Sequence, residues 1–345
     1  MIDKSSTAFA TIPMQLIGPI KIIGPVVDDE VRVPIATFES PLWLSTDRGA
    51  AVSMRSGGIQ AIIIDERMSR SVLVEAPDAR CAAQAMNKLL ARKQELGRIA
   101  QSTSRYAEFL DIHWQLIANL LFIRLEMKTG DASGHNMVTK AADAILRWIL
   151  NEHPELSYVS VSGNYCADKK VAAVNGILGR GKNVIAEMTV PNKICRRYLK
   201  TAPRHIVDLN VKKNLYGSIV AGGLRTANAH FANMLLGFYL ATGQDAANII
   251  EGSQGFVNAE VRDHDLYFAV TLPNLILGTV GAGKDLEFVQ ENLRALGCAQ
   301  ERQPGENARR LAVIAAATVL CGELSLLAAL TNPGELMAAH ERLER

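Results

Sequence analysis

The segment best equipped for chemistry is residues 161–170, with the sequence Val-Ser-Gly-Asn-Tyr-Cys-Ala-Asp-Lys-Lys. It combines an acid, two adjacent lysines, a serine and an asparagine. Adjacent ammonium groups repel each other, so a loop that carries both usually binds an anion. A charged run alone is more often a solvated surface than a site. Three distant residues, together with this run, make a site the better interpretation; they are Glu39, Asp245 and His340.

Longer motifs accompany these residues in a consistent order along the chain. They occupy residues 33–40, 123–137, 210–215, 227–233, 278–281 and 304–309. With these motifs the chain resembles the 3-hydroxy-3-methylglutaryl-coenzyme A (HMG-CoA) reductase family from about Pro13 to its end. The motif spacing is closer to the eukaryotic and archaeal class of that family than to the bacterial degradative class.

Composition limits the class of protein. The 345 residues, 48% of them hydrophobic, suffice for two domains or for one large domain with an insertion. A net charge of +2 gives no electrostatic reason to expect nucleic acid or a membrane surface as a partner. The five cysteines lack metal-ligand spacing, which predicts free thiols, no metal site and a cytoplasmic location.

No membrane-spanning or secretory segment is expected. The first 20 residues lack the pattern of a signal peptide. The most apolar stretch, residues 312–330, contains Glu323 and is predicted to be a buried helix. We therefore expect the membrane anchor of eukaryotic relatives, and most of the family's N-terminal helical domain, to be absent.

The pattern of residues 71–161 predicts a small inserted domain. A strand at 71–76 precedes a helix at 78–96 capped by Asp78, strands at 106–112 and 120–127, a helix at 134–150 and a strand at 157–161. This βαββαβ order is that of a ferredoxin-like unit. The resemblance implies that such an insertion binds the nicotinamide cofactor.

Residues 1–70 and 162–345 are predicted to form the larger, substrate-binding domain of an α+β fold. A long central helix is expected at 222–243, with His230, Asn233 and Gly237 on one face, and a second helix at 306–330. The sequence Thr-Asn-Pro-Gly then breaks the chain before a last helix at 335–344. Residues 331–345, which carry His340, are predicted to be a mobile flap.

The resemblance implies catalytic roles for four residues. Reduction of a thioester to an alcohol takes two hydride transfers, with a thiol leaving between them. Lys169 would stabilise the developing oxyanion and Glu39 would donate a proton, with Asp245 as the second carboxylate of a Glu39–Lys169–Asp245 network. His340 would protonate the departing CoA thiolate. The family usually has Lys-Ser before this histidine, whereas this chain has two alanines, Ala338 and Ala339.

Substrate contacts are also carried over from the resemblance. Arg70, Lys170 and Lys213 would bind the free carboxylate, with Ser162 and Asn233 as hydrogen-bond partners and Asp168 holding Lys170. Arg48 and Lys200 would meet CoA phosphates. His230 either supports Asn233 from one turn away or is a buried core histidine.

The expected cofactor is NADPH. Residues 130–136 open a helix with small side chains, which suits a pyrophosphate although the Gly-x-Gly-x-x-Gly fingerprint is missing. The implied contacts in this segment are Asp131, Gly134, His135 and Asn136. A second stretch, Ser104-Arg105-Tyr106, matches the family near the ribose phosphate, and Arg105 favours NADPH over NADH. A later glycine run supplies Gly281 and Ala282.

The chain departs from the family pattern at several positions. Ser133 and His135 stand where the family usually has Met, Ala282 replaces a glycine, and Asp47 and Ala51 stand near Arg48 in place of the usual Asn and Arg. The resulting interpretation is a four-electron, NADPH-dependent reduction of HMG-CoA to mevalonate, the precursor of isoprenoids.

The expected assembly is a homodimer or dimer of dimers with active sites between subunits. Two alternatives remain. One is a related reductase that acts on another acyl thioester or on a carrier-protein thioester. The other is a catalytically silent homologue that binds acyl-CoA or nucleotide.

Overall fold

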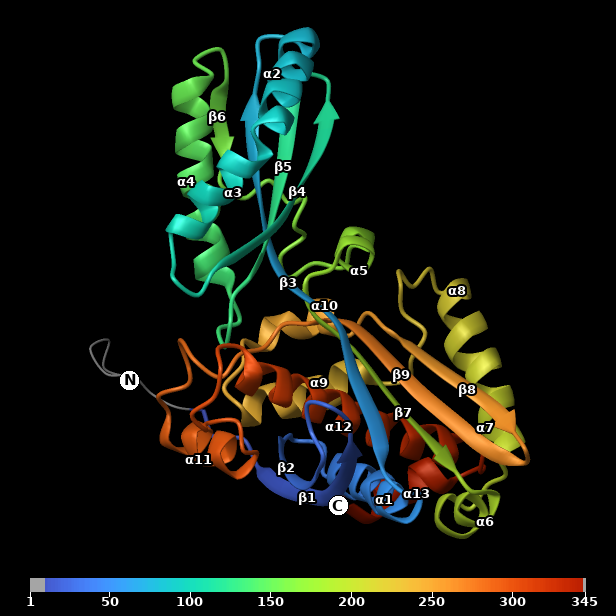
Figure 1. Cartoon of the computed structure of the whole chain (residues 1–345). Coiled ribbons are helices and arrows are strands. Elements are labelled where there is room, and N and C mark those ends of the chain that lie inside the picture. The colour runs from blue at the N-terminus through green and yellow to red at the C-terminus, as the bar shows by residue number, and fades with distance from the viewer. Residues whose placement is uncertain (1–9, 344–345) are drawn as a thin grey trace, which may run out of the picture.

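The structure, a computed structural model, describes residues 10–343 of the chain. Two predictions fall partly outside the described residues. The stretch searched for a signal peptide includes residues 1–9, and the last predicted helix ends at Glu344. Figure 1 shows a broad lower body and a smaller upper unit, with one long strand that runs through both. Each part has its own cluster of buried apolar side chains.

The joining strand is β3, which spans Ile59–Glu75. Its first half, from Gln60 to Arg67, pairs with β7 in the sheet of the lower body. Its second half, from Met68 to Glu75, pairs with β5 in the upper unit. One continuous strand therefore crosses the predicted domain boundary between residues 70 and 71.

The sheet of the lower body has the strand order β2-β1-β3-β7-β9-β8. Side chains of β7 alternate between buried and half-buried positions, as expected of a strand with one face on a core. The strands pair antiparallel except for β1 and β3, which are parallel. Their bounds are β1 Met14–Ile23, β2 Asp29–Ala36, β7 Gly181–Val190, β8 Phe256–Arg262 and β9 Asp265–Leu275.

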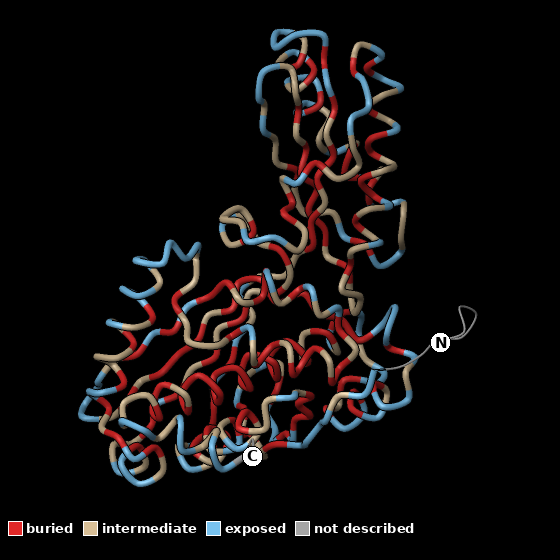
Figure 2. Tube along the Cα trace, turned by 180° about the vertical axis from the view of Figure 1, so that it is seen from behind, coloured by how far each residue is buried: buried red, intermediate tan, exposed pale blue. Residues whose placement is uncertain are grey.

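Helix α12, Glu306–Leu330, runs through the core of the lower body and is packed against α1, Pro41–Arg55. It is long and apolar enough to cross a membrane, yet 94% of its most apolar window is buried inside the protein. Figure 2 shows this part of the chain as almost continuously buried. The prediction of a buried core helix is confirmed.

The predicted helix at 222–243 is wrong in its first part. Helix α9 begins only at Phe231 and ends at Ala241. The carboxylate of Glu323, on α12, accepts hydrogen bonds from the backbone amides of Ala229 at 2.9 Å and His230 at 2.6 Å. A distant acid thus caps the start of α9, and residues 222–230 form an irregular connection instead of a helix.

The upper unit follows the predicted element order with one break. Asp78 caps α2 by accepting a hydrogen bond from the Cys81 amide at 2.7 Å, as predicted. The helix expected to continue to residue 96 ends at Ala91, and α3 starts at Lys93. Arg92 between them binds Glu95 and Glu152 instead of continuing the helix. The bounds are α2 Ala79–Ala91, α3 Lys93–Ser102, β4 Glu108–Ile117, β5 Leu120–Lys128, α4 His135–Glu152 and β6 Ser157–Ser160.

Short elements surround the lower body. Among them, the segment from α7 to α8 forms a protrusion at its edge (Figure 1). Their bounds are α5 Ala173–Leu178, α6 Asn192–Ile194, η1 Cys195–Leu199, α7 Pro203–Leu209, η2 Asn210–Gly217, α8 Ser218–Val220, η3 Ala246–Asn248, α10 Ile249–Gly252, α11 Glu287–Ala295 and α13 Glu335–Leu343.

Candidate active site

The lysine-bearing loop joins β6 to α5 and has an unusual backbone. Asn164, Ala167 and Lys169 all adopt left-handed φ values, of 59°, 45° and 54°. Side chains from other elements hold this loop: Arg124 donates to the carbonyl of Tyr165 at 2.9 Å, and Asn175 Nδ2 donates to that of Ala167 at 3.2 Å. Left-handed conformations of non-glycine residues persist only where the surroundings enforce them, so the loop is a constrained structure.

Lys169 Nζ forms an ion pair of 2.5 Å with Asp245 Oδ2. The other Asp245 oxygen accepts a hydrogen bond from the Ala247 amide at 3.0 Å, which places the carboxylate at the start of η3. Burial acts to raise the pKa of Asp245, but the hydrogen bonds from Lys169 and Ala247 outweigh it and the pKa is lowered. Asp245 is therefore an ionised partner of Lys169.

Asp168 lies between two predicted groups of residues. Arg70 was predicted to bind the substrate, and His135 was predicted to bind the cofactor. The Asp168 carboxylate forms ion pairs with Arg180 at 2.6 Å and with Arg70 at 3.1 Å, and His135 Nε2 lies 3.6 Å from it. Burial acts to raise the Asp168 pKa, but Arg180 and the other cations lower it overall. Burial and the nearby Arg180 charge lower the pKa of His135. Lys170 points back along the loop and donates to the Asp168 backbone carbonyl at 3.0 Å.

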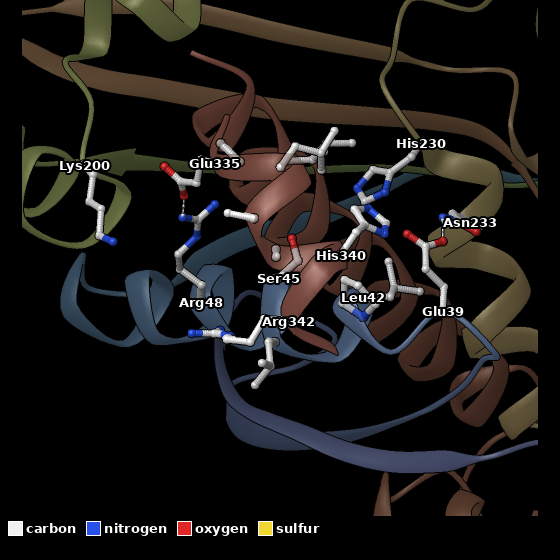
Figure 3. A pocket seen from close by; sticks show the side chains of 17 residues that line it. Glu39, Leu42, Ser45, Arg48, Lys200, His230, Asn233, Glu335, His340 and Arg342 are labelled. Atoms are coloured by element: carbon white, nitrogen blue, oxygen red, sulfur yellow. Dashed lines mark hydrogen bonds and ion pairs between the residues drawn. The ribbon is translucent and has the colours of Figure 1, made fainter. Parts of the chain in front are cut away.

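A second group of predicted residues lines a pocket of about 550 Å³ beneath α13. Figure 3 shows His340 beside His230 and Glu39 in this pocket. Glu39 Oε2 accepts a hydrogen bond of 2.5 Å from Asn233 Nδ2, on α9. Arg48 and Lys200 line the same pocket at its other end.

The predicted Glu39–Lys169–Asp245 network is divided in the structure. Within residues 10–343, Lys169 pairs with Asp245 and Glu39 bonds to Asn233, and no ion pair joins Glu39 to Lys169. Lys213 lies on η2, where its ammonium donates to Asn214 at 3.3 Å, and Ser162 follows β6, where its carbonyl accepts from Ser160 Oγ at 3.1 Å. Neither Lys213 nor Ser162 lines the pocket that holds Glu39.

The three segments predicted for the cofactor lie together. The Thr279 amide donates to the Asp131 carbonyl at 2.8 Å, and Ala132 and Val280 form a parallel bridge. A Cβ atom built on Gly130 would lie 3.9 Å from Cβ of Tyr106. Because residues 104–106, 130–136 and 278–282 meet, one extended ligand can contact all three. The Asp131 carboxylate is also structural, because it accepts from the amides of Gly305 and Ala308, both at 2.9 Å, at the start of α12.

The first turn of α4 fits a dinucleotide pyrophosphate. Gly134 precedes this 18-residue helix with a φ of 97°, and no side chain of the described residues caps it. A Cβ at Gly134 would lie 2.6 Å from Thr129 Oγ1, so only glycine fits there. Gly281, with a φ of 103°, has no atom within 4 Å of the place of a Cβ. Free amides at a helix N-terminus beside an open glycine turn suit a phosphate group.

The remaining predicted cofactor residues are accessible to a ligand. Asn136 in the first turn of α4 and Ala282 beside Gly281 are both exposed. The Arg105 guanidinium lies 4.6 Å from the centre of the Tyr106 ring, in the loop that Ser104 begins. A cation held against an aromatic ring near the pyrophosphate turn suits a further phosphate.

Three buried charged residues at this site were not predicted from the sequence. Arg180 and Glu251 lie beneath the lysine loop. Lys284 donates to the Gly243 carbonyl, two residues before Asp245, and burial, opposed by Asp245 and Asp285, lowers its pKa to about 8. Lys284 directly follows the glycine run at 281–283, and this run is the one feature of the sequence that could have identified it. No comparable sequence feature accompanies Arg180 or Glu251.

Comparisons with known proteins agree with the motifs. A sequence model of hydroxymethylglutaryl-coenzyme A reductase matches residues 5–345. The 3-hydroxy-3-methylglutaryl-coenzyme A reductase of Pyrococcus horikoshii is 43% identical over 337 residues, which cover 97% of this chain and 81% of that protein. A rice (Oryza sativa subsp. indica) reductase of the same name is 40% identical, over 95% of this chain and 62% of its own length. These matches to archaeal and plant relatives agree with the prediction of the eukaryotic and archaeal class.

The fold is shared with a solved structure. The class II enzyme of Streptococcus pneumoniae, described as bound to NADPH in open conformations, superposes with a TM-score of 0.75. The match covers 96% of this chain and 88% of that one at 18% identity, so it bears on the fold alone. Taken with the sequence matches, it leads to one conclusion. This chain belongs to the hydroxymethylglutaryl-coenzyme A reductase family.

Proposed function

We propose that this chain reduces HMG-CoA to mevalonate and free CoA, with NADPH as the reductant. Membership of the reductase family supports the overall reaction. The single observation that carries the chemistry is the Lys169–Asp245 ion pair of 2.5 Å in a constrained loop. It provides a fixed cation in a position that is partly open to a ligand, since 39% of the Lys169 side chain is exposed.

Lys169 would stabilise the negative charge that develops on the thioester oxygen. A positioned cation can lower the barrier for such a step by several kcal/mol; one oxyanion donor contributes about 3 kcal/mol. Asp245 is ionised and keeps the ammonium in place. Because the loop is held by Arg124 and Asn175, the cation needs little reorganisation when charge develops.

Glu39 and His340 would handle the protons. Asn233 donates to Glu39 Oε2 and so fixes one oxygen of the carboxyl group, leaving the other for a transferred proton. His340 lies in the same pocket, on the terminal helix, where an imidazolium can protonate a departing thiolate. His230, three residues before Asn233, lines the same pocket with a partly buried side chain, and we propose that it supports Asn233.

NADPH, when bound, supplies the hydride. The free amides at the start of α4 would hold its pyrophosphate, and Gly281 and Ala282 would let the dinucleotide approach the backbone. Arg105, with Ser104 and Tyr106, would bind the 2′-phosphate that distinguishes NADPH from NADH. His135 and Asn136 in the first turn of α4 complete this surface.

The substrate would be held by separate cations at its two ends. Arg70 and Lys170 lie on the lysine loop side and, with Lys213, Ser162 and Asn233, would bind the free carboxylate. Arg48 and Lys200 at the far end of the pocket would meet CoA phosphates. Arg48 is half-buried and donates to both the hydroxyl and the carbonyl of Ser325, so its guanidinium is held in place for such a contact.

We also propose that two copies of the chain complete each site. Among residues 10–343, no ion pair joins Glu39 to Lys169 and Lys169 does not line the Glu39 pocket. Exposed apolar side chains also flank the loop and the protrusion near it. They are Val171, Ile177, Ile219 and Val220, each more than half exposed. Such side chains favour association. A homodimer with shared sites accounts for both features.

Complementation tests the shared site. Lys169→Ala and Glu39→Gln chains, each inactive alone, would be co-expressed with different tags and the mixed dimer purified. A shared site restores activity in the mixed dimer, because one of its two sites then contains both wild-type residues. No recovery, or a monomer by light scattering, would overturn the proposal.

Steady-state oxidation of NADPH with HMG-CoA tests the reaction itself, with product identification by mass spectrometry. Mevalonate and CoA formed at two NADPH per product are expected. Turnover only with a pantetheine-loaded carrier protein would favour the carrier-thioester alternative. Binding of acyl-CoA without any oxidation would indicate a silent homologue.

We further propose a cytoplasmic location, consistent with five cysteines that are all free thiols.

A further inference from the structure

Glu251 is a fully buried carboxylate directly beneath the lysine loop. It lies on α10 and has no exposed surface. Its Oε1 atom accepts hydrogen bonds from Arg180 Nε at 2.7 Å and from Asn175 Nδ2 at 2.9 Å. Its Oε2 atom has no hydrogen-bond partner among residues 10–343. A buried acid that is only half satisfied is costly, which calls for an explanation.

Arg180 connects this carboxylate to the loop. Its side chain is 1% exposed, and it bonds to Glu251 through Nε and to Asp168 through Nη2, at 2.6 Å. A third contact, from Nη1 to Ser69 Oγ at 3.2 Å, fixes the guanidinium against β3. Because one planar group bridges the two acids, a change at Glu251 is transmitted to Asp168, the neighbour of Lys169.

Glu251 also acts on the loop backbone through its charge. The dipole of the Lys169 amide favours the ionised form of the Glu251 carboxylate. Lys169 is one of the three non-glycine residues in the loop with a left-handed φ. An amide attracted to a buried negative charge helps to hold this unfavourable conformation, which sets the direction in which the Lys169 side chain leaves the loop.

We propose that Glu251 is a positioning residue for Lys169, whose negative charge holds the loop through Arg180 and the Lys169 amide so that the ammonium stays at Asp245. The inference rests on the proposed catalytic role of Lys169. It assigns to Glu251 a role in turnover, beyond balancing the charge of Arg180.

The environment of Glu251 makes this role dependent on pH. Burial raises its pKa, Arg180 lowers it and Asp168 raises it, with a result of about 7. The groups that face it are Arg180, Asp168, the Lys169 amide and Asn175, together with the buried hydroxyl of Tyr239 from α9. Near neutral pH, a proton on Glu251 would therefore release the loop, and its loss would restore the productive arrangement.

Glu251→Gln tests the role in turnover, because glutamine keeps the shape and one acceptor but removes the charge. We expect kcat for HMG-CoA to fall about tenfold to a hundredfold, as for partners that orient a functional group, while KM changes less than about threefold. The ionisation near neutral pH should vanish from its kcat–pH profile. Glu187→Gln is the matched control, since Glu187 accepts from Tyr267 at the opposite end of β7. A Glu251→Gln profile that overlays the wild type would overturn the proposal.

Hydrogen exchange of the Lys169 amide in the wild-type protein provides a test that needs neither activity nor a variant. After correction for intrinsic exchange, protection of this amide should fall as the pH drops from 8 to 6, whereas amides in β7 should not change. Constant protection would contradict the proposal even if Glu251→Gln failed to fold. An inactive wild type that still shows the pH-dependent protection would refute the proposed function but not the positioning by Glu251.

Discussion

Arg48 and Glu335 form an ion pair of 2.5 Å that ties the terminal helix α13 to helix α1. The same guanidinium donates to the carbonyl of Ser325 at 2.6 Å and to its hydroxyl at 3.0 Å. Arg48, which we propose to meet a CoA phosphate, is thus already paired with an acid from the flap. A phosphate that binds Arg48 has to compete with Glu335.

Replacing Glu335 should therefore strengthen CoA binding. A partly exposed ion pair is worth at most about 1 kcal/mol, so the dissociation constant for CoA should fall up to about fivefold in Glu335→Gln. Calorimetric titration with CoA measures this, and Glu341→Gln, an exposed acid on the same helix, is the control. Equal affinities in the two variants would show that Glu335 does not compete for Arg48.

Lys169→Ala should abolish turnover while the fold survives. No neutral side chain replaces the cation at the developing oxyanion, so kcat should fall at least about a thousandfold. The melting temperature should change little, because the lysine is partly exposed and Asp245 is its one ion-pair partner within residues 10–343. Lys193→Ala, an exposed lysine on α6, should remain active. A Lys169→Ala enzyme with near-normal turnover would rule out the oxyanion role.

Cofactor preference should depend on Arg105. Loss of a charge-assisted hydrogen bond to the 2′-phosphate costs about 1.5–3 kcal/mol, so KM for NADPH should rise about tenfold to a hundredfold in Arg105→Ala. KM for NADH should change little. Arg98→Ala on the neighbouring helix α3, also an exposed arginine, serves as the control. An equal rise for both cofactors would assign Arg105 to another part of the dinucleotide.

His340→Gln should separate the two halves of the reaction. If His340 protonates the CoA thiolate, reduction of HMG-CoA should slow about a hundredfold. Reduction of free mevaldehyde, which has no thiol left to release, should be nearly unchanged. Steady-state rates on both substrates measure the difference. Equal losses would mean that His340 serves a step shared by both reductions.

Stability should respond to pH through Glu251. Its pKa is raised in the folded protein from an ordinary value near 4.5 to about 7. Between these values the folded state binds a proton that the unfolded state has lost, so the free energy of unfolding falls as the pH rises. The loss is about 3 kcal/mol. In Glu251→Gln, this fall in the free energy of unfolding with rising pH should be absent.

Denaturant unfolding at pH 5 and pH 8 tests this sign. The stability of Glu251→Gln relative to wild type should increase from the lower to the higher pH. A difference that stays constant or changes in the opposite direction would show that Glu251 is not a raised-pKa acid. The other titrating groups are common to both proteins and cancel in the comparison.

Local features were predictable where the cause lies within a few residues. The Asp78 cap bonds to an amide three residues away, and the core helix at 306–330 follows from a long apolar run. The start of α9 was not predictable, because the acid that caps it, Glu323, lies 93 residues from His230 in the sequence. The break at Arg92 likewise involves Glu152, which comes from a different helix.

The sequence by itself determined the family, the α+β class and the identity of the candidate residues, because each depends on ordered motifs and residue types. Only the tertiary structure decided which of these residues meet. It paired Lys169 with Asp245 and Glu39 with Asn233, with no ion pair between Glu39 and Lys169 among residues 10–343. It also placed Arg180 and Glu251 beneath the lysine loop. Such contacts depend on distances between segments far apart in the chain, and the charge of a buried acid depends on the surroundings that folding creates.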